Sequence, residues 1–223
     1  MGSLFTQLLL YGGAAAFAAP AAAVVTAFVL GKSARPLTSA AAFVAGAAFL
    51  DVVVTIVLLL VFGSSLQEGG DLGAYVDLGL GVIFLVIGVL AIFQHDSPEK
   101  DDAQRARVQR LATAGVATMA TAGIVVQIIN VDAIAVMAGG LKEIVEASIG
   151  GVGGAIAVLF LLALMLIPYY APALVFAASL GRARPLLERM TDWIVAHSRV
   201  LEIGTGLGFG ALFLVKGLLD LLG

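Results

Sequence analysis

The sequence contains no cysteine, and only 12% of its 223 residues are charged. The lack of cysteine excludes disulfides, thiolate catalysis, Cys-X-X-Cys redox relays and cysteine-ligated metal sites. The two histidines, His95 and His197, lie far apart and lack ligand spacing, and no Walker motif is present. A net charge of -3 gives no indication of a nucleic-acid partner. We therefore expect neither enzymatic activity nor a cofactor.

What the chain has in abundance is apolar residues, which make up 61% of it and give a mean hydropathy of +1.09. A soluble domain is about half apolar and about a quarter charged. The composition therefore predicts an all-α, multi-pass protein of the cell membrane, because about 20 apolar residues cross a bilayer as helix. The expected spans are Leu4 to Leu30, Thr38 to Phe62, Tyr75 to Phe93, Leu111 to Met137, Gly150 to Leu180 and Val200 to Leu222.

The basic residues predict the orientation of these spans, since lysine and arginine concentrate in cytoplasmic loops. Most of the 12 basic residues fall after the first, third and fifth spans. Both termini are therefore expected outside the cytoplasm, and the opposite face receives mainly acids. The basic residues on the cytoplasmic face are Lys32, Arg35, Lys100, Arg105, Arg107, Arg110, Arg182, Arg184, Arg189 and Arg199; the outer face receives Glu68, Asp71, Asp77, Lys142, Glu143 and Glu146.

The stretch "RARPLLERMTDWIVAHSRV" differs from the spans because its apolar residues recur at helical spacing with charges between them. This pattern predicts an amphipathic helix over residues 183–198 that lies in the cytoplasmic interface, with Trp193 at headgroup depth. The alternative is an ordinary linker whose sequence is periodic by chance.

Weak internal similarity divides the single membrane domain, residues 1–223, into two halves. Residues 1–95 and 111–223 each supply three spans, and a cytoplasmic linker, residues 96–110, joins them. Pro20 and Asn130 occupy matching places in the first span of each half. Two inverted three-helix repeats with broken helices are typical of secondary transporters.

Three polar residues interrupt the fourth span, namely Gln127, Asn130 and Asp132. Successive helical residues lie about 100° apart, so a continuous helix could not place Asn130 and Asp132 on one face. Either the helix unwinds near Asn130 and these side chains line a substrate path, or Asn130 caps the helix and Asp132 reaches the outer headgroups.

Asp51 lies near the middle of the second span, where a charged carboxylate is costly. It is therefore neutral, paired or turned toward water. Lys216 in the sixth span lies at a similar depth, which makes an Asp51–Lys216 pair one alternative. An unpaired Asp51 would instead act as a protonation switch.

The motif "LMLIPYYAPALVF" interrupts the fifth span, because Pro168 and Pro172 each remove a backbone donor. Tyr169 and Tyr170 either satisfy the freed carbonyl groups, bind a substrate headgroup or form an interfacial belt. Small residues at four-residue spacing, such as Gly206 and Gly210, allow close helix packing within the fold or in a homodimer.

The C-terminal run "LIPYYAPALVFAASLGRARPLLERMTDWIVAHSRVLEIGTGLGFGALFLVKGLLDLL" resembles the GAP family, also called sulfolipid-1-addressing proteins. Pro20 followed by "KSARPLTSAAAFVAGAAF" extends the resemblance to the first half. This family is similar to the lysine exporter (LysE) superfamily, in which the first span of each half carries an Asn-Pro or proline-rich break. Here the second half has Asn130-Val131 without proline, and Pro20 lacks a preceding asparagine.

The resemblance implies export of a glycolipid, or help in moving it to the actinobacterial cell surface, with membrane lipids and large lipid exporters as partners. The superfamily implies a rival, proton-coupled efflux of an amino acid or small cation. A third alternative is a non-transporting accessory subunit of a lipid-export complex. A lipid carrier should show an apolar, laterally open groove, whereas a small-solute exporter should show a closed polar pocket at mid-depth. The apolar composition favours the lipid.

Overall fold

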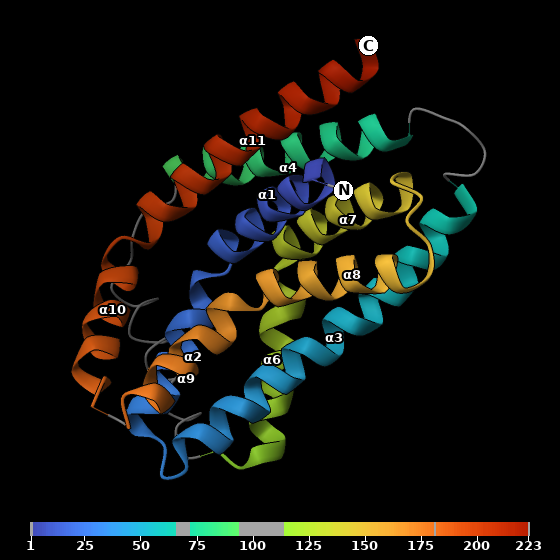
Figure 1. The fold of residues 1–223 in the computed structure, drawn as a ribbon. Coiled ribbons are helices and arrows are strands. Elements are labelled where there is room, and N and C mark those ends of the chain that lie inside the picture. Colours follow the sequence, from blue (N-terminus) through green and yellow to red (C-terminus); the bar gives the residue numbers. More distant parts are fainter. Residues whose placement is uncertain (1, 66–71, 94–113, 181, 223) are drawn as a thin grey trace.

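The computed structural model describes residues 2–65, 72–93, 114–180 and 182–222, and in these ranges the chain forms helices and no strand (Figure 1). The side chains of a few helix-end residues within these ranges, and of Val131, are not described. The predicted linker, residues 96–110, lies outside the described residues. The helices are α1 (Gly2–Ala18), α2 (Pro20–Lys32), α3 (Pro36–Ser65), α4 (Leu72–Phe93), α6 (Val116–Ile129), α7 (Val131–Glu146), α8 (Gly151–Met165), α9 (Ile167–Ala178), α10 (Arg184–Ala196) and α11 (Ser198–Leu222).

Three of these helices, α3, α4 and α11, are each long and apolar enough to cross a membrane alone. The remaining spans are bent pairs of shorter helices. The chain turns by 61° between α1 and α2, by 75° between α6 and α7, and by 72° between α8 and α9. If each bent pair is one span, the described residues contain up to 6 spans. The architecture is thus that of an integral membrane protein, and its inverted repeat stays a prediction.

Each bend follows from local sequence. α2 begins at Pro20, whose missing backbone N–H and fixed φ suit the first position of a helix but end the preceding one. α6 ends at Ile129 and Asn130 separates it from α7. α9 begins just before Pro168, after Leu166. Pro172 corrects the expectation of a further break, because α9 continues through it.

The packing brings the two halves of the chain together. α4 lies along α11, α3 crosses α6, α1 contacts both α7 and α8, and α2 packs on α9 and α10 (Figure 1). Glycine permits two of these approaches. A Cβ atom on Gly123 would lie 2.0 Å from the Phe43 carbonyl oxygen, and one on Gly206 would lie 2.5 Å from Gly88. These crossings bring the backbone of α3 close to that of α6, and the backbone of α4 close to that of α11.

Large apolar side chains cover much of the outer surface. Val86 on α4, Ile56 on α3 and Leu159 on α8 are all exposed. An apolar surface this extensive is unfavourable in water, because soluble monomers rarely expose large contiguous patches. The outward faces of the long helices therefore fit contact with lipid.

The helix expected over residues 183–198 is present as α10. Leu187 is buried against α2, whereas Leu186 and Trp193 are exposed on the outer side. The Trp193 indole stacks on the His197 ring at a centroid distance of 4.8 Å. The position of α10 in the cytoplasmic interface stays a prediction.

Candidate functional site

The structure brings three polar side chains from separate spans into one buried group, here called the Asp51 cluster: Asp51 on α3, Gln127 on α6 and Tyr169 on α9. The Gln127 Nε2 donates a hydrogen bond to Asp51 Oδ1 at 2.6 Å. The Tyr169 hydroxyl donates to Gln127 Oε1, which fixes the orientation of the amide. All three side chains are buried, Asp51 to the extent that only 1% of it is exposed.

Close helix packing explains why these side chains meet. The glycine-mediated crossing of α3 and α6 lies one to two turns before Asp51, and it holds Gln127 within reach. The Phe43 ring stacks on Tyr169 at 5.5 Å, while the Thr55 hydroxyl donates to the Met137 sulfur at 3.5 Å. The second carboxylate oxygen of Asp51, Oδ2, is buried and has no hydrogen-bond partner.

The breaks in the first and fourth spans also meet, next to the Asp51 cluster. In the amide orientation that satisfies both of its side-chain atoms, Asn130 donates to the Ala18 carbonyl oxygen at 3.2 Å and to Asp132 Oδ1 at 2.7 Å. Ala18 is the last residue of α1, and Asp132 lies in the first turn of α7. Asp132 Oδ1 also accepts from the Ala133 N–H at 3.0 Å. Asn130 and Asp132 are both partly buried at the junction of the two bends.

The two tyrosines of the fifth span point to different environments. Tyr169 is buried in the Asp51 cluster. Tyr170 donates to the Ala163 carbonyl oxygen at 3.0 Å, in the turn before the break. Of the two hydroxyls, only Tyr170 therefore serves a backbone carbonyl of its own span.

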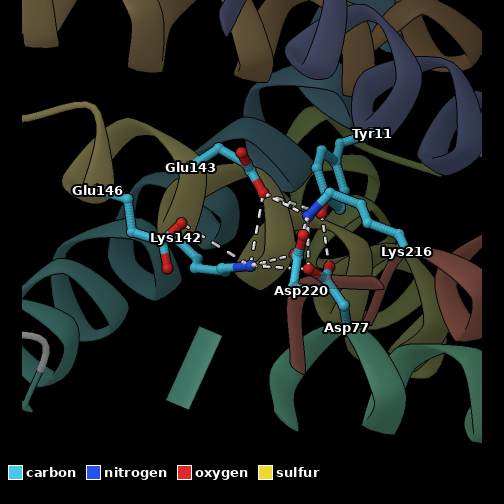
Figure 2. A network of polar contacts seen from close by, with 7 residues as sticks. All are labelled: Tyr11, Asp77, Lys142, Glu143, Glu146, Lys216 and Asp220. Carbon is cyan, nitrogen blue, oxygen red and sulfur yellow. Dashed lines mark hydrogen bonds and ion pairs between the residues drawn. The ribbon is translucent and has the colours of Figure 1, made fainter. Parts of the chain in front are cut away.

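A second polar group, here called the lysine network, lies among α1, α4, α7 and α11 (Figure 2). The Lys142 Nζ is 2.7 Å from Asp77 Oδ2, and the Lys216 Nζ is 2.6 Å from the same oxygen. Lys216 also contacts Glu143 at 2.8 Å. The Tyr11 hydroxyl donates to Asp77 Oδ1 at 2.6 Å. The network consists of Tyr11, Asp77, Lys142, Glu143, Glu146, Lys216 and Asp220.

The lysine network corrects two expectations from sequence. Lys216 does not pair with Asp51. α11 packs on α4, so Lys216 contacts Asp77 on α4 and Glu143 on α7, whereas Asp51 contacts Gln127 on α6. The fourth span does not end at Met137, because α7 continues to Glu146. Asp77 and Lys142, which the sequence assigns to the outer face, are 0% and 2% exposed.

The sequence does contain a signal for this network. Lys142 and Glu146, and likewise Lys216 and Asp220, stand four residues apart, the spacing at which opposite charges meet on one helical face. A lysine followed by an acid at this spacing inside an apolar helix indicates a compensated charge. Tyr11 carries no comparable signal, because only tertiary packing brings its hydroxyl on α1 to Asp77 on α4.

A groove of about 1100 Å³, open to the exterior, lies between α3 on one side and the end of α7, the turn after it and α8 on the other. Its walls are mostly apolar, with Val52 and Ile56 from α3 and Val158 and Leu159 from α8. Polar groups gather where α7 ends, with Glu146 and Ser148. The Glu146 Oε2 is 3.8 Å from the Lys142 Nζ, so this end of the groove adjoins the lysine network.

Comparison with known proteins connects this geometry to a family. A family model described as "Sap, sulfolipid-1-addressing protein" (SfLAP) matches residues 9–219. The chain belongs to the SfLAP family. No curated protein and no solved structure matches the chain. Membership in SfLAP implies a role in addressing or exporting sulfolipid-1, while the relation to the LysE superfamily stays a prediction.

Proposed function

We propose that this SfLAP protein binds a sulfolipid-type glycolipid by its acyl chains in the groove between α3 and α8 and helps to move it to the cell surface. The observation that carries the proposal is the groove itself. Its volume of about 1100 Å³ is at or above the upper end for pockets that hold drug-sized ligands, about 300–1,000 Å³. Its open side would let an acyl chain enter directly from the bilayer.

The distribution of polarity in the groove matches an amphiphile. Apolar side chains of α3 and α8 form the walls, and Glu146 and Ser148 mark one end. A lipid lying there would place its chains along the walls and its headgroup beside these residues. A small-solute exporter needs an accessible polar pocket at mid-depth, but the side chains of the Asp51 cluster are packed against protein.

The proposed orientation places this polar end at the outer leaflet. Lys32, Arg35 and Arg184 lie at the end of the bundle where α2 ends and α10 packs, away from the turn between α7 and α8 (Figure 1). Because lysine and arginine favour the cytoplasmic side, the polar end of the groove is proposed to lie toward the opposite side of the cell membrane. A lipid that leaves the groove at the polar end of the groove would therefore move toward the cell surface.

Native mass spectrometry of the purified protein mixed with a sulfated diacyl glycolipid tests the proposal. The wild type should retain the lipid. Ile56→Trp and Leu159→Trp, two exposed positions that line the groove, should reduce retention at least tenfold because the indole occupies the path of the chain. Val86→Trp on α4 is the matched control, since Val86 is exposed but does not line the groove.

Equal retention by all three variants would contradict the groove as the binding site. A neutral glycolipid with the same chains shows whether the sulfate contributes to binding. Saturable binding of free lysine without any lipid would support the amino-acid exporter instead.

A further inference from the structure

We propose that Asp51 is a proton-binding site in the centre of the helix bundle, with the Asp51 side chain held neutral by a proton on Oδ2. This inference concerns a site separate from the groove between α3 and α8 and does not depend on what the groove binds. It rests on the burial of Asp51, on the missing partner of Oδ2 and on the absence of an ion pair between Asp51 and any basic side chain that the structure describes.

The polar contacts of Asp51 fit a neutral acid better than a carboxylate. One donor, Gln127 Nε2, reaches Oδ1, and Oδ2 has none. A buried carboxylate normally requires several donors or a cation, because ionised groups lose far more hydration than neutral ones. A proton on Oδ2 removes the charge without any further partner.

The groups that face Asp51 do not supply a counter-charge. α6 presents Gln127, and α9 presents the Tyr169 hydroxyl, which is neutral and already donates to Gln127. The charged group of α7 that lies near the Tyr169 hydroxyl is Asp132, which is also an acid. No described lysine, arginine or histidine forms an ion pair with Asp51. The buried Lys142 and the partly buried Lys216 are both engaged in the lysine network.

A metal ion would not fit this position as well as a proton. Hard cations such as Na⁺ and Ca²⁺ require several oxygen ligands. Here one carboxylate oxygen accepts from an N–H, and the other has no polar neighbour in hydrogen-bonding geometry. Among the described residues no group of His, Cys, Asp and Glu side chains is arranged to hold a metal ion.

The position of the site links the proton to the bend in the fourth span. Gln127 lies in the last turn of α6, directly before Asn130, where α6 gives way to α7. Loss of the proton would leave a carboxylate that needs water, and the break at Asn130 follows three residues after Gln127, the donor to Asp51. Release of the proton is therefore expected to require that this junction opens to water.

Infrared difference spectroscopy across a pH titration provides the direct test. The wild type should show the carbonyl stretch of a protonated carboxylic acid at neutral pH, and Asp51→Asn should lack this band. Asp192→Asn on α10 is the matched control, because the Asp192 carboxylate is exposed and its loss should leave the band unchanged. A wild type without the band at neutral pH would overturn the proposal, as would a band that persists in Asp51→Asn.

Thermal unfolding against pH provides the second measurement. The folded state holds a proton that the unfolded chain releases at neutral pH, so stability is greatest at acidic pH and falls as pH rises, by up to tenfold in the folding equilibrium constant per pH unit. Asp51→Asn should remove this part of the pH dependence. Stabilisation of the wild type, but not of Asp51→Asn, by Na⁺ relative to choline would identify a metal-ion site and overturn the proposal.

Discussion

The Asp51 cluster and the lysine network bury acids in opposite ways. In the lysine network, Asp77 contacts two lysines and a tyrosine hydroxyl, and Glu143 shares Lys216 with it. In the Asp51 cluster, one amide faces one carboxyl group and no cation is present. Asp51 and Asp77 are 1% and 0% exposed, so these two acids differ in charge compensation and not in burial.

The comparison shows how one chain can keep acids inside a membrane bundle for two purposes. Compensated charges hold helices together but penalise the loss of any partner, because the remaining ion is left buried. An uncompensated acid is tolerated only in its neutral form, which leaves it free to take up and release a proton. The lysine network is therefore expected to contribute to structure, and the Asp51 cluster to respond to pH.

The largest difference should follow from removing the central acid of the lysine network. Asp77→Ala leaves Lys142 and Lys216 without their closest partner and should lower the free energy of unfolding by about 3–5 kcal/mol. Denaturant titration in detergent micelles measures the change. Asp220→Ala, at the exposed edge of the same network, should cost at most about 1 kcal/mol. Equal losses from both variants would contradict the central role of Asp77.

A double-mutant cycle sharpens the contrast. Lys142→Met and Asp77→Asn should each destabilise the protein, and the double variant should lose less than the two changes added together, by about 0.5–3 kcal/mol. The reason is that each single variant leaves one ionised group buried without its partner, whereas the double variant removes both charges of the pair. Strict additivity, measured by the same titrations, would show that the 2.7 Å contact carries no coupling.

Each region contains one buried tyrosine, which allows a matched comparison. Tyr11→Phe removes a donor to the charged Asp77 and should cost about 1.5–3 kcal/mol. Tyr169→Phe removes a donor to the neutral Gln127 amide and should cost about 0.5–1.5 kcal/mol. Thermal melts of the two variants measured side by side give the order. The reverse order would indicate that the Asp51 cluster carries the stronger charge.

The smallest effect is expected at Asp51 itself. Asp51→Asn preserves the shape of the neutral acid and should change the free energy of unfolding at neutral pH by less than about 1 kcal/mol, the range of a neutral hydrogen bond. Asp77→Asn is the matched substitution in the lysine network and should cost several times more. A large loss for Asp51→Asn at neutral pH would mean that the folded protein needs a negative charge there.

The positions at which the spans bend were easier to predict from the sequence than the helices that each span contacts. Pro20 and Asn130 disturb helix formation locally, so the bends at these residues are visible in the chain itself. Pro172 shows the limit of such reasoning, because a proline inside a packed helix can be accommodated by its surroundings. Whether Pro172 ends the helix is decided by tertiary packing.

The pairing of buried charges could not be predicted from depth. Their positions within the predicted spans assigned Asp51 and Lys216 similar depths, but depth contains no information about which helices are neighbours. The neighbours follow from close glycine crossings such as that of Gly123 with α3, which a sequence rich in glycine does not single out. Hydropathy also ended the fourth span too early, because it counts Lys142 as polar although Asp77 on α4 helps to compensate its buried charge.

The hydrogen bond between Asn130 and the carbonyl oxygen of Ala18 has a mechanical consequence. It joins the kink between α1 and α2 to the kink between α6 and α7, where the helical backbone hydrogen bonds are interrupted. Straightening either kink would break this tie and strand a polar group in an apolar interior. The two halves are therefore expected to bend together, with this hydrogen bond as their shared pivot.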